Sequence, residues 1–309
     1  MYLKQAYKGY TDFWRYLIIL LLVFVLNIIS SIPFSIAAAA KALINGSNIQ
    51  DFAANMDPTT LGFTENQGLL LLITPLALVF IGLTMGMKYI HGVSWRQVYT
   101  SASRFRWKNF FFAVVFWLLL LVAFEYIYFI KHPESYSFHF AGNQFWIMLI
   151  ISLLSFPLQA SWEELYFRGN LMQGIGVLTG TRYIPLILTS VLFGLMHILN
   201  PEVDEFGTGI AMAQYMGFGL LLGITVVMDG GLEMAFGMHT INNIYAACFV
   251  SYKGSVLHTP SLFSSSDVDL KFMTISFYVG AALFLVVTKY VFKWESFTWI
   301  FKPLRRSEA

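Results

Sequence analysis

The chain has 309 residues, of which 57% are hydrophobic, 17% aromatic and only 12% charged, and its mean hydropathy is +0.66. A soluble domain of this length keeps roughly a quarter of its residues charged, so much of this surface is expected to face lipid. The net charge of +2, without a clustered basic face, excludes nucleic acid as an expected partner. The single cysteine, Cys248, excludes an internal disulfide and is expected to be a buried, inert thiol.

Apolar windows of about 20 residues, the length that crosses ~30 Å of hydrocarbon, recur along the whole chain. The first follows a positively charged segment and is too long for a removable signal peptide, so it is predicted to span the membrane. The sequence therefore predicts an all-α polytopic membrane protein, with residues 1–309 forming a single membrane domain. About eight transmembrane helices are expected, near residues 16–40, 68–88, 109–130, 145–178, 183–199, 209–228, 231–250 and 271–292.

Lysines and arginines are distributed unevenly between the two predicted sides of the membrane. If eight spans alternate from a cytoplasmic N-terminus, the outer side holds only Lys41, Lys131, Lys253 and Lys271. Because positive residues favour the cytoplasmic side, both termini are predicted to be cytoplasmic, in the bacterial inner (plasma) membrane. Residues 94–108, basic and aromatic, are expected along the anionic lipid surface. The inner side and the inner halves of the spans hold Lys4, Lys8, Arg15, Lys88, Arg96, Arg104, Arg106, Lys108, Arg168, Arg182, Lys289, Lys293, Lys302, Arg305 and Arg306.

The fourth predicted span keeps three charged residues within the sequence SWEELYFR, namely Glu163, Glu164 and Arg168. Each charge at mid-membrane costs on the order of 3 kcal/mol, so it has to be paired or used. Glu164 and Arg168 are four residues apart on a helix, with the acid first, which predicts an ion pair. Glu163 lies about 100° around the helix from Glu164 and is therefore left available for chemistry.

Two further spans carry polar groups that are predicted to lie at a similar depth. Folding the fourth and fifth spans about Gly180 pairs residues that are equally far from this turn, as Glu163 and His197 are. His239 and Asn243 share one helix face of the seventh span, roughly 12–18 Å from its inner end. Each residue alone is more often a packing residue, but the set has no simple packing rationale. It predicts a polar active-site cavity inside the bundle.

Other polar and small residues are expected to be structural. Glu125 lies near an outer helix end, Glu233 follows an inner turn, and Gly219 and Gly223 form a close-packing pair. The remaining histidines lie in loops or at span ends. HExxH, P-loop, GxSxG and paired GxGD motifs are absent from the sequence, so zincin, nucleotide-hydrolase, rhomboid-like and presenilin-like chemistries have no support.

Three short polar motifs occur in order on the fourth, fifth and seventh predicted spans: Glu163-Glu164-x-x-x-Arg168, Phe193-x-x-x-His197 and His239-x-x-x-Asn243. Together they resemble the signature of the CPBP family, the type II CAAX prenyl proteases and their bacteriocin-processing, Abi-like bacterial relatives. The resemblance covers roughly residues 145–250, between N-terminal spans in 16–130 and a C-terminal span at 271–292. It implies a multi-span helical fold and intramembrane hydrolysis of a peptide or membrane-protein substrate, such as a prenylated CAAX-like tail.

Carried over residue by residue, the resemblance makes Glu163 the general base that activates a water, which His197 helps to hold. It makes His239 and Asn243 the groups that stabilise the oxyanion of the tetrahedral intermediate. The residue types suit these roles, because a carboxylate in a low-dielectric cavity becomes more basic. Imidazole and amide N–H groups are good donors to an oxyanion, and such a donor can contribute ~3 kcal/mol.

The resemblance assigns Glu164 and Arg168 to the support of the site and leaves the metal open. Zinc bound by Glu163, His197 and His239 is the alternative to a reaction without a cofactor. The amide of the third motif is a poor zinc ligand, and a carboxylate used as a ligand cannot also act as the base. A metal-independent, glutamate-dependent protease is therefore the favoured hypothesis.

Two other functions remain as alternatives at this point. A non-catalytic membrane scaffold or immunity factor would keep the fold in order to bind a partner. A transporter could use the same polar cavity as a path for protons or solutes, although two similar halves with broken helices are not recognisable in the sequence.

Overall fold

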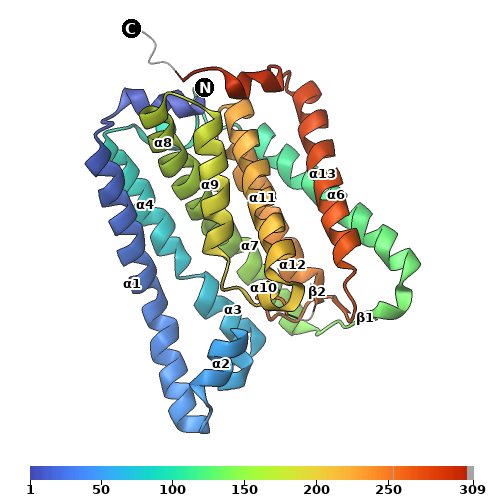
Figure 1. Ribbon diagram of the computed structural model, residues 1–309. Coiled ribbons are helices and arrows are strands. Elements are labelled where there is room, and N and C mark those ends of the chain that lie inside the picture. Colours follow the sequence, from blue (N-terminus) through green and yellow to red (C-terminus); the bar gives the residue numbers. More distant parts are fainter. Residues whose placement is uncertain (253, 305–309) are drawn as a thin grey trace.

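The computed structural model describes residues 1–252 and 254–304, so that Lys253, Arg305 and Arg306 of the charge distribution lie outside it. Helices lie side by side in one bundle, and the N-terminal segment and the last described residues meet at the same end (Figure 1). The helices are η1 (Tyr2–Lys8), α1 (Phe13–Asn45), α2 (Ile49–Asn55), η2 (Pro58–Leu61), α3 (Glu65–Ile73), α4 (Leu76–His91), α5 (Trp95–Tyr99), α6 (Trp107–Lys131), η3 (Pro133–Ser135), α7 (Asn143–Glu164), η4 (Leu165–Leu171), α8 (Met172–Thr179), α9 (Tyr183–Met196), α10 (Pro201–Phe206), α11 (Thr208–Asp229), α12 (Glu233–Cys248), α13 (Leu270–Val291) and η5 (Phe297–Phe301).

The predicted all-α polytopic membrane fold is confirmed, with a difference in the lengths of two spans. Within the described residues, six helical stretches are long and apolar enough to cross a membrane. The other two predicted spans are α9 and α12, with 14 and 16 residues. At 1.5 Å per residue they cover ~21 and ~24 Å, less than the hydrocarbon thickness. The six stretches are Phe13–Asn45, Glu65–His91, Trp107–Lys131, Asn143–Thr179, Thr208–Asp229 and Leu270–Val291.

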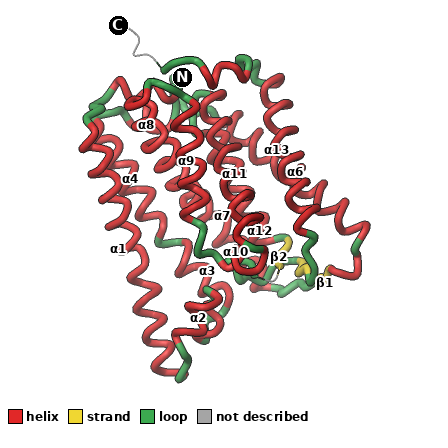
Figure 2. Tube along the Cα trace, in the orientation of Figure 1, coloured by secondary structure: helices red, strands yellow, loops and turns green. Residues whose placement is uncertain are grey.

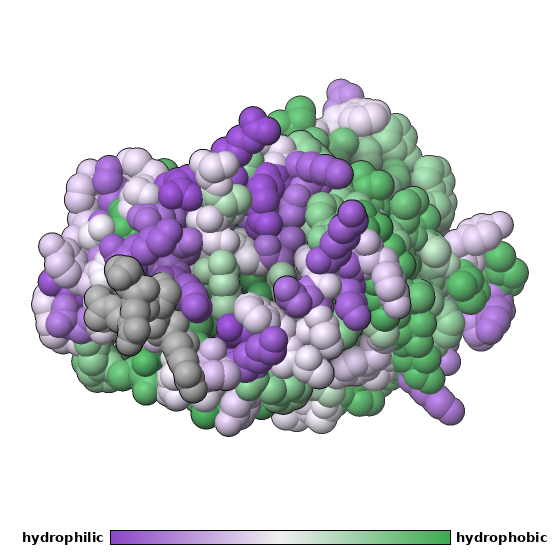
Figure 3. Space-filling view, turned by 90° about the horizontal axis from the view of Figure 1, so that it is seen from above, coloured by the Kyte–Doolittle hydropathy of each residue, from purple (hydrophilic) through white to green (hydrophobic). Residues whose placement is uncertain are grey.

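The outside of the bundle is apolar along its length and polar at the end that holds the termini. Large apolar side chains stand exposed on the outer helices, including Phe24 of α1, Leu119 of α6 and Tyr290 of α13. Seen from above, hydrophilic residues gather across this end, whereas hydrophobic residues cover much of the flank (Figure 3). Exposed apolar patches of this extent are unfavourable in water and favourable in hydrocarbon, as expected of an integral membrane protein.

Helix α12 is the most enclosed helix of the bundle. Its residues from Glu233 to Ile241 are all buried, and it packs against α6, α7 and α11. A helix surrounded in this way does not face lipid, so it can be short and can carry polar residues. This explains why α12 lacks the length and apolarity of a typical span.

The few strand residues form a small sheet at the end of the bundle opposite the termini (Figure 2). The strands are β1 (Tyr136–Phe138), β2 (Val250–Tyr252) and β3 (Phe263–Ser265), in the order β1-β3-β2. β3 pairs antiparallel with β1 and parallel with β2. The sheet thereby ties the segment after α6 to the segments after α12.

A buried ion-pair cluster joins α6, α11 and α12 at the end that holds the termini. Arg106 Nη2 lies 2.7 Å from Asp229 Oδ2 and 2.6 Å from Glu233 Oε2. The glycine turn between α11 and α12 is present, with Gly230 in the left-handed conformation. Glu233, which sequence patterns left without a role, is therefore a structural anchor. Arg106 of segment 94–108 is thus engaged in ion pairs inside the bundle, and the position of this segment along the lipid surface stays a prediction.

The predicted close-packing pair Gly219 and Gly223 lies where α11 crosses α9. A Cβ at position 219 would lie 3.1 Å from the Cα and carbonyl oxygen of Ser190, and one at position 223 would lie 2.5 Å from Leu186 Cδ1. The contact at position 219 involves backbone atoms, which cannot move aside as a side chain can. Glycine at this position therefore sets the distance between the two helices.

Replacing Gly219 by alanine is expected to lower the free energy of unfolding by about 1–3 kcal/mol, the usual cost of overpacking. Unfolding in mixed micelles of detergent and dodecyl sulfate measures this change. The matched control is Gly209→Ala on the same helix, because a Cβ there meets nothing within 4 Å. Equal stability of the two variants would show that the close approach of α9 and α11 is not limiting.

Candidate active site

The antiparallel pairing of the fourth and fifth predicted spans is present. Gly180 ends α8 with a φ of 65°, the left-handed conformation expected for a glycine at this turn. Phe167 and Phe193 are equally far from Gly180 in sequence, and their ring centroids lie 5.3 Å apart. The pairing rule that placed Glu163 and His197 at one depth therefore describes this helix pair.

A π-helical segment, η4, follows the two glutamates directly. The N–H of Met172 donates to the carbonyl of Phe167, five residues back instead of four. π-Helical turns are rare and occur frequently at functional sites. This segment contains Arg168, so the wider turn lies inside the first sequence motif.

The predicted ion pair between Glu164 and Arg168 is present and completely buried. Arg168 Nη1 donates to Glu164 Oε1 over 2.9 Å, and both side chains have no exposed surface. Arg168 Nη2 donates to the carbonyl of Gly219 over 2.8 Å, and its guanidinium lies 4.7 Å from the centre of the Phe193 ring. One arginine thus connects η4 with α7, α9 and α11.

His239 lies between the two glutamates. Its Nδ1 donates to Glu164 Oε1 over 2.9 Å, while its Nε2 faces Glu163 Oε2 at 3.8 Å. The carboxylate contact fixes the orientation of the ring and places a proton on Nδ1. Glu164 therefore binds two partners, His239 of the third motif and Arg168 of its own motif.

An amide bridge connects Glu163 with Asn243. Gln159 Nε2 donates to Glu163 Oε1, and Asn243 Nδ2 donates to Gln159 Oε1 over 2.8 Å. The other oxygen, Glu163 Oε2, is buried and has no hydrogen-bond partner among the described residues. Among the same residues, Glu164 Oε2 is likewise buried without a hydrogen-bond partner, but it is Glu163 Oε2 that faces the second ring nitrogen of His239. The neighbouring Asn242 points away from this bridge and accepts a hydrogen bond from Trp117 on α6.

His197 caps the end of α9 beside these groups. Its Nδ1 donates to the carbonyl of Phe193 over 2.8 Å, and its ring stacks on Tyr215 with centroids 4.5 Å apart. With the proton on Nδ1, the neutral ring keeps a lone pair on Nε2. His197 is thus held in one orientation with a free acceptor nitrogen.

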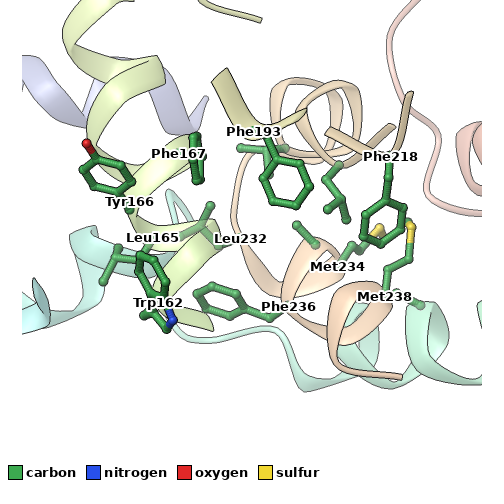
Figure 4. Close-up of a cluster of buried hydrophobic side chains, with 14 of the residues drawn as sticks. Trp162, Leu165, Tyr166, Phe167, Phe193, Phe218, Leu232, Met234, Phe236 and Met238 are labelled. Atoms are coloured by element: carbon green, nitrogen blue, oxygen red, sulfur yellow. The ribbon is translucent and has the colours of Figure 1, made fainter. Parts of the chain in front are cut away.

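Aromatic and apolar side chains enclose the polar groups. Phe193 lies between Phe167 and Phe218 (Figure 4). The rings of Phe193 and Phe218 lie 5.9 and 5.4 Å from the ring of His239. Such walls exclude bulk water and strengthen the electrostatic interactions inside them.

The alternative zinc site of Glu163, His197 and His239 does not match the arrangement of these side chains. Within residues 1–252 and 254–304, no three His, Cys, Asp or Glu side chains are grouped so that they could hold a metal ion. The expectation of a reaction without a cofactor stays a prediction.

Sequence reasoning missed Gln159 and the second contact of Glu164. The signal for Gln159 was present, because it precedes Glu163 by four residues and so shares its helix face. The contact between Glu164 and His239 joins residues 75 positions apart. No local pattern indicates such a contact, so only the packing of α7 against α12 reveals it.

Replacing Gln159 with leucine is expected to lower kcat for peptide hydrolysis by ~10–150-fold, the equivalent of a hydrogen bond to a charged group. The reason is that Gln159 orients Glu163 and Asn243, so KM should change little. Steady-state kinetics in lipid nanodiscs measure both constants. The control is Gln173→Leu, because Gln173 is an equally buried amide in α8 that donates to the Tyr2 carbonyl instead. Equal kinetics of the two variants would exclude a positioning role.

The fold and this site define a polytopic membrane protein with a buried cluster of carboxylates, imidazoles and amides. A family model, "Type II CAAX prenyl endopeptidase Rce1-like", matches residues 142–245, which include the whole cluster. The chain is also 30% identical over 261 residues to "Uncharacterized protein YyaK" of Bacillus subtilis (strain 168), covering 83% of this chain and 85% of that relative. No solved structure matches the chain.

The chain therefore belongs to the Rce1-like family of type II CAAX prenyl endopeptidases. The resemblance stated from the three motifs is confirmed. At the level of the family, the protein is an intramembrane protease of the CAAX type.

Proposed function

We propose that the protein is a glutamate-dependent intramembrane endopeptidase in which Glu163 activates the attacking water. The observation that carries this proposal is the buried, unsatisfied Oε2 of Glu163 beside His239. Their separation of 3.8 Å is too long for a direct hydrogen bond and short enough for one water to contact both. The free Nε2 of His197 supplies a further acceptor for this water.

The proposed role of His239 as a donor to the oxyanion requires a proton on both of its ring nitrogens. In this state Nδ1 donates to Glu164 and Nε2–H is available to a developing oxyanion. Asn243 uses one amide hydrogen for Gln159 and keeps the second one available.

The proposed reaction follows from these positions. Glu163 takes a proton from the water, whose oxygen attacks the carbonyl carbon of the scissile peptide bond. The negative charge on the carbonyl oxygen is stabilised by N–H groups of His239 and Asn243. The proton held by Glu163 passes to the leaving nitrogen as the C–N bond breaks. No other acid or base is needed to balance this sequence.

The substrate class in this proposal is a peptide or membrane-protein segment, with a prenylated CAAX-like C-terminal tail as the first candidate because the family description names it. Support for a membrane-bound substrate is the location of the site within a bundle whose flanks are apolar. We also place the end that holds the termini in the cytoplasm, because Lys4, Lys8, Arg96 and Lys302 lie in the segments at that end.

The test compares membrane proteomes of cells that carry either the parent chain or Glu163→Ala. A peptidase of this kind leaves an uncleaved precursor that accumulates only in cells with the variant. Restoring the parent chain should remove the precursor. Identical proteomes under conditions in which both chains are expressed equally would contradict the proposal.

A further inference from the structure

A cavity of about 280 Å³ lies between α6, α12 and α13. Its walls come from the second half of α6, the first half of α13, α12 and the loops around the small sheet. It is therefore nearer to the sheet end of the bundle than to the termini (Figure 1). The sequence motifs and the proposed reaction use none of its residues.

The cavity combines aromatic walls with three carboxylates, of which Asp269 also caps α13 by accepting from the N–H groups of Lys271 and Phe272. Tyrosine and phenylalanine side chains from α6, α12 and α13 are among its lining residues. Glu125 lies within it and accepts a hydrogen bond from Tyr136, while Asp267 and Asp269 lie exposed at its edge. The lining includes no lysine, arginine or histidine, and among the described residues none of the three carboxylates forms an ion pair.

A cavity that contains carboxylates and aromatic side chains favours a positively charged ligand. A carboxylate in a low-dielectric setting is unfavourable alone and is stabilised by a cation beside it. Aromatic side chains of the lining, among them Tyr128 and Tyr245, supply apolar surface for the methylene stem of an ammonium or guanidinium group. The volume exceeds that of one lysine or arginine side chain, so a basic side chain fits.

The cavity adjoins the catalytic cluster through one aromatic ring and one asparagine pair. The ring of Phe218 lies 5.4 Å from that of His239 on one side and 6.3 Å from that of Trp117, a cavity residue, on the other. Asn242 lines the cavity, and the next residue, Asn243, belongs to the catalytic cluster. A peptide bond held at the cluster could thus place a neighbouring side chain in the cavity.

We infer that this cavity is a specificity pocket that binds a basic side chain of the peptide substrate close to the scissile bond, with Glu125 as its main counter-charge. This assignment rests on the proposed function. It adds a preference for a lysine or arginine near the cleaved bond, which neither the three motifs nor the family description contains.

The experiment measures binding to the full chain in a Glu163→Ala background, so that hydrolysis plays no part. The probes are two fluorescent nine-residue peptides that are identical except for a central lysine or the neutral norleucine, and the nanodiscs contain no choline lipid. The lysine peptide should bind at least tenfold more tightly. Adding Glu125→Gln should abolish this preference and leave binding of the norleucine peptide unchanged.

The matched control is Glu134→Gln, which removes a carboxylate close in sequence to Tyr136 but outside the cavity, with a side chain 72% exposed. It should retain the lysine preference. Glutamine can still accept the hydrogen bond from Tyr136, so Glu125→Gln is expected to fold, and unchanged affinity for norleucine verifies this. Equal binding of the two peptides, or a preference that survives Glu125→Gln, overturns the pocket. A protease that cleaves without lysine preference would leave the proposed function standing.

Discussion

Replacing Glu163 with glutamine is expected to lower kcat for peptide hydrolysis by ~10²–10⁴-fold, the usual contribution of a general base. Glutamine has the same shape but cannot take a proton from water. Because Glu163 Oε2 has no hydrogen-bond partner among the described residues, the fold loses no hydrogen bond there. Activity should therefore fall without a change in thermal stability.

Steady-state kinetics and thermal unfolding of the purified chain in nanodiscs measure these two quantities together. Glu295→Gln is the control, because Glu295 is an exposed carboxylate after α13 and remote from the cluster. Its kcat should equal that of the parent. A Glu163→Gln enzyme with kcat within tenfold of the parent would refute the role of Glu163 as the base.

Replacing Arg168 with methionine is expected to destabilise the protein by about 3–5 kcal/mol, the cost of breaking a buried ion pair on one side. The change leaves Glu164 without its cation and the carbonyl of Gly219 without its donor. Lysine should not restore stability, because a single ammonium does not reproduce the planar fork that reaches both acceptors. Activity should also fall, since Glu164 orients His239.

The double variant Glu164→Gln/Arg168→Met separates charge from packing. It removes both charges and is expected to be more stable than Arg168→Met alone, because no uncompensated carboxylate stays buried. Unfolding in mixed micelles of detergent and dodecyl sulfate measures the free energies of unfolding of the parent, the single variant and the double variant. If the single and double variants have the same free energy of unfolding, Arg168 does not stabilise the protein through its ion pair with Glu164.

Local spacing in the sequence predicted the parts of the site that depend on a single helix or a single turn. The pair Glu164–Arg168 follows from four-residue spacing, and the packing of Phe167 on Phe193 follows from the turn at Gly180. Among the described residues, hydropathy identified all six helical stretches that are long and apolar enough to cross a membrane, because contact with lipid requires apolar side chains along a whole helix.

Tertiary contacts determined the rest of the site and could not be read from local patterns. His239 contacts both glutamates only because α12 packs against α7. The short length of α12 was also not predicted, since hydropathy does not distinguish a helix surrounded by protein from one in lipid. Helix α9, which keeps exposed apolar side chains on one side, ends at Met196, three residues before the end of its predicted span. The ion pairs of Arg106 were not predicted either, because its partners Asp229 and Glu233 lie more than a hundred residues later in the sequence.

The π-helical segment η4 contains one more residue per hydrogen-bonded turn than the α-helices on either side. Deleting a single residue there would restore α-helical geometry and rotate α8 by about 100° relative to Glu163. Gln173 would then turn away from the carbonyl of Tyr2, to which it donates in η1. The additional residue in η4 therefore sets the rotation of α8, and with it the contact to the N-terminal segment, relative to the two glutamates. A one-residue deletion would change this relative rotation without altering any catalytic side chain.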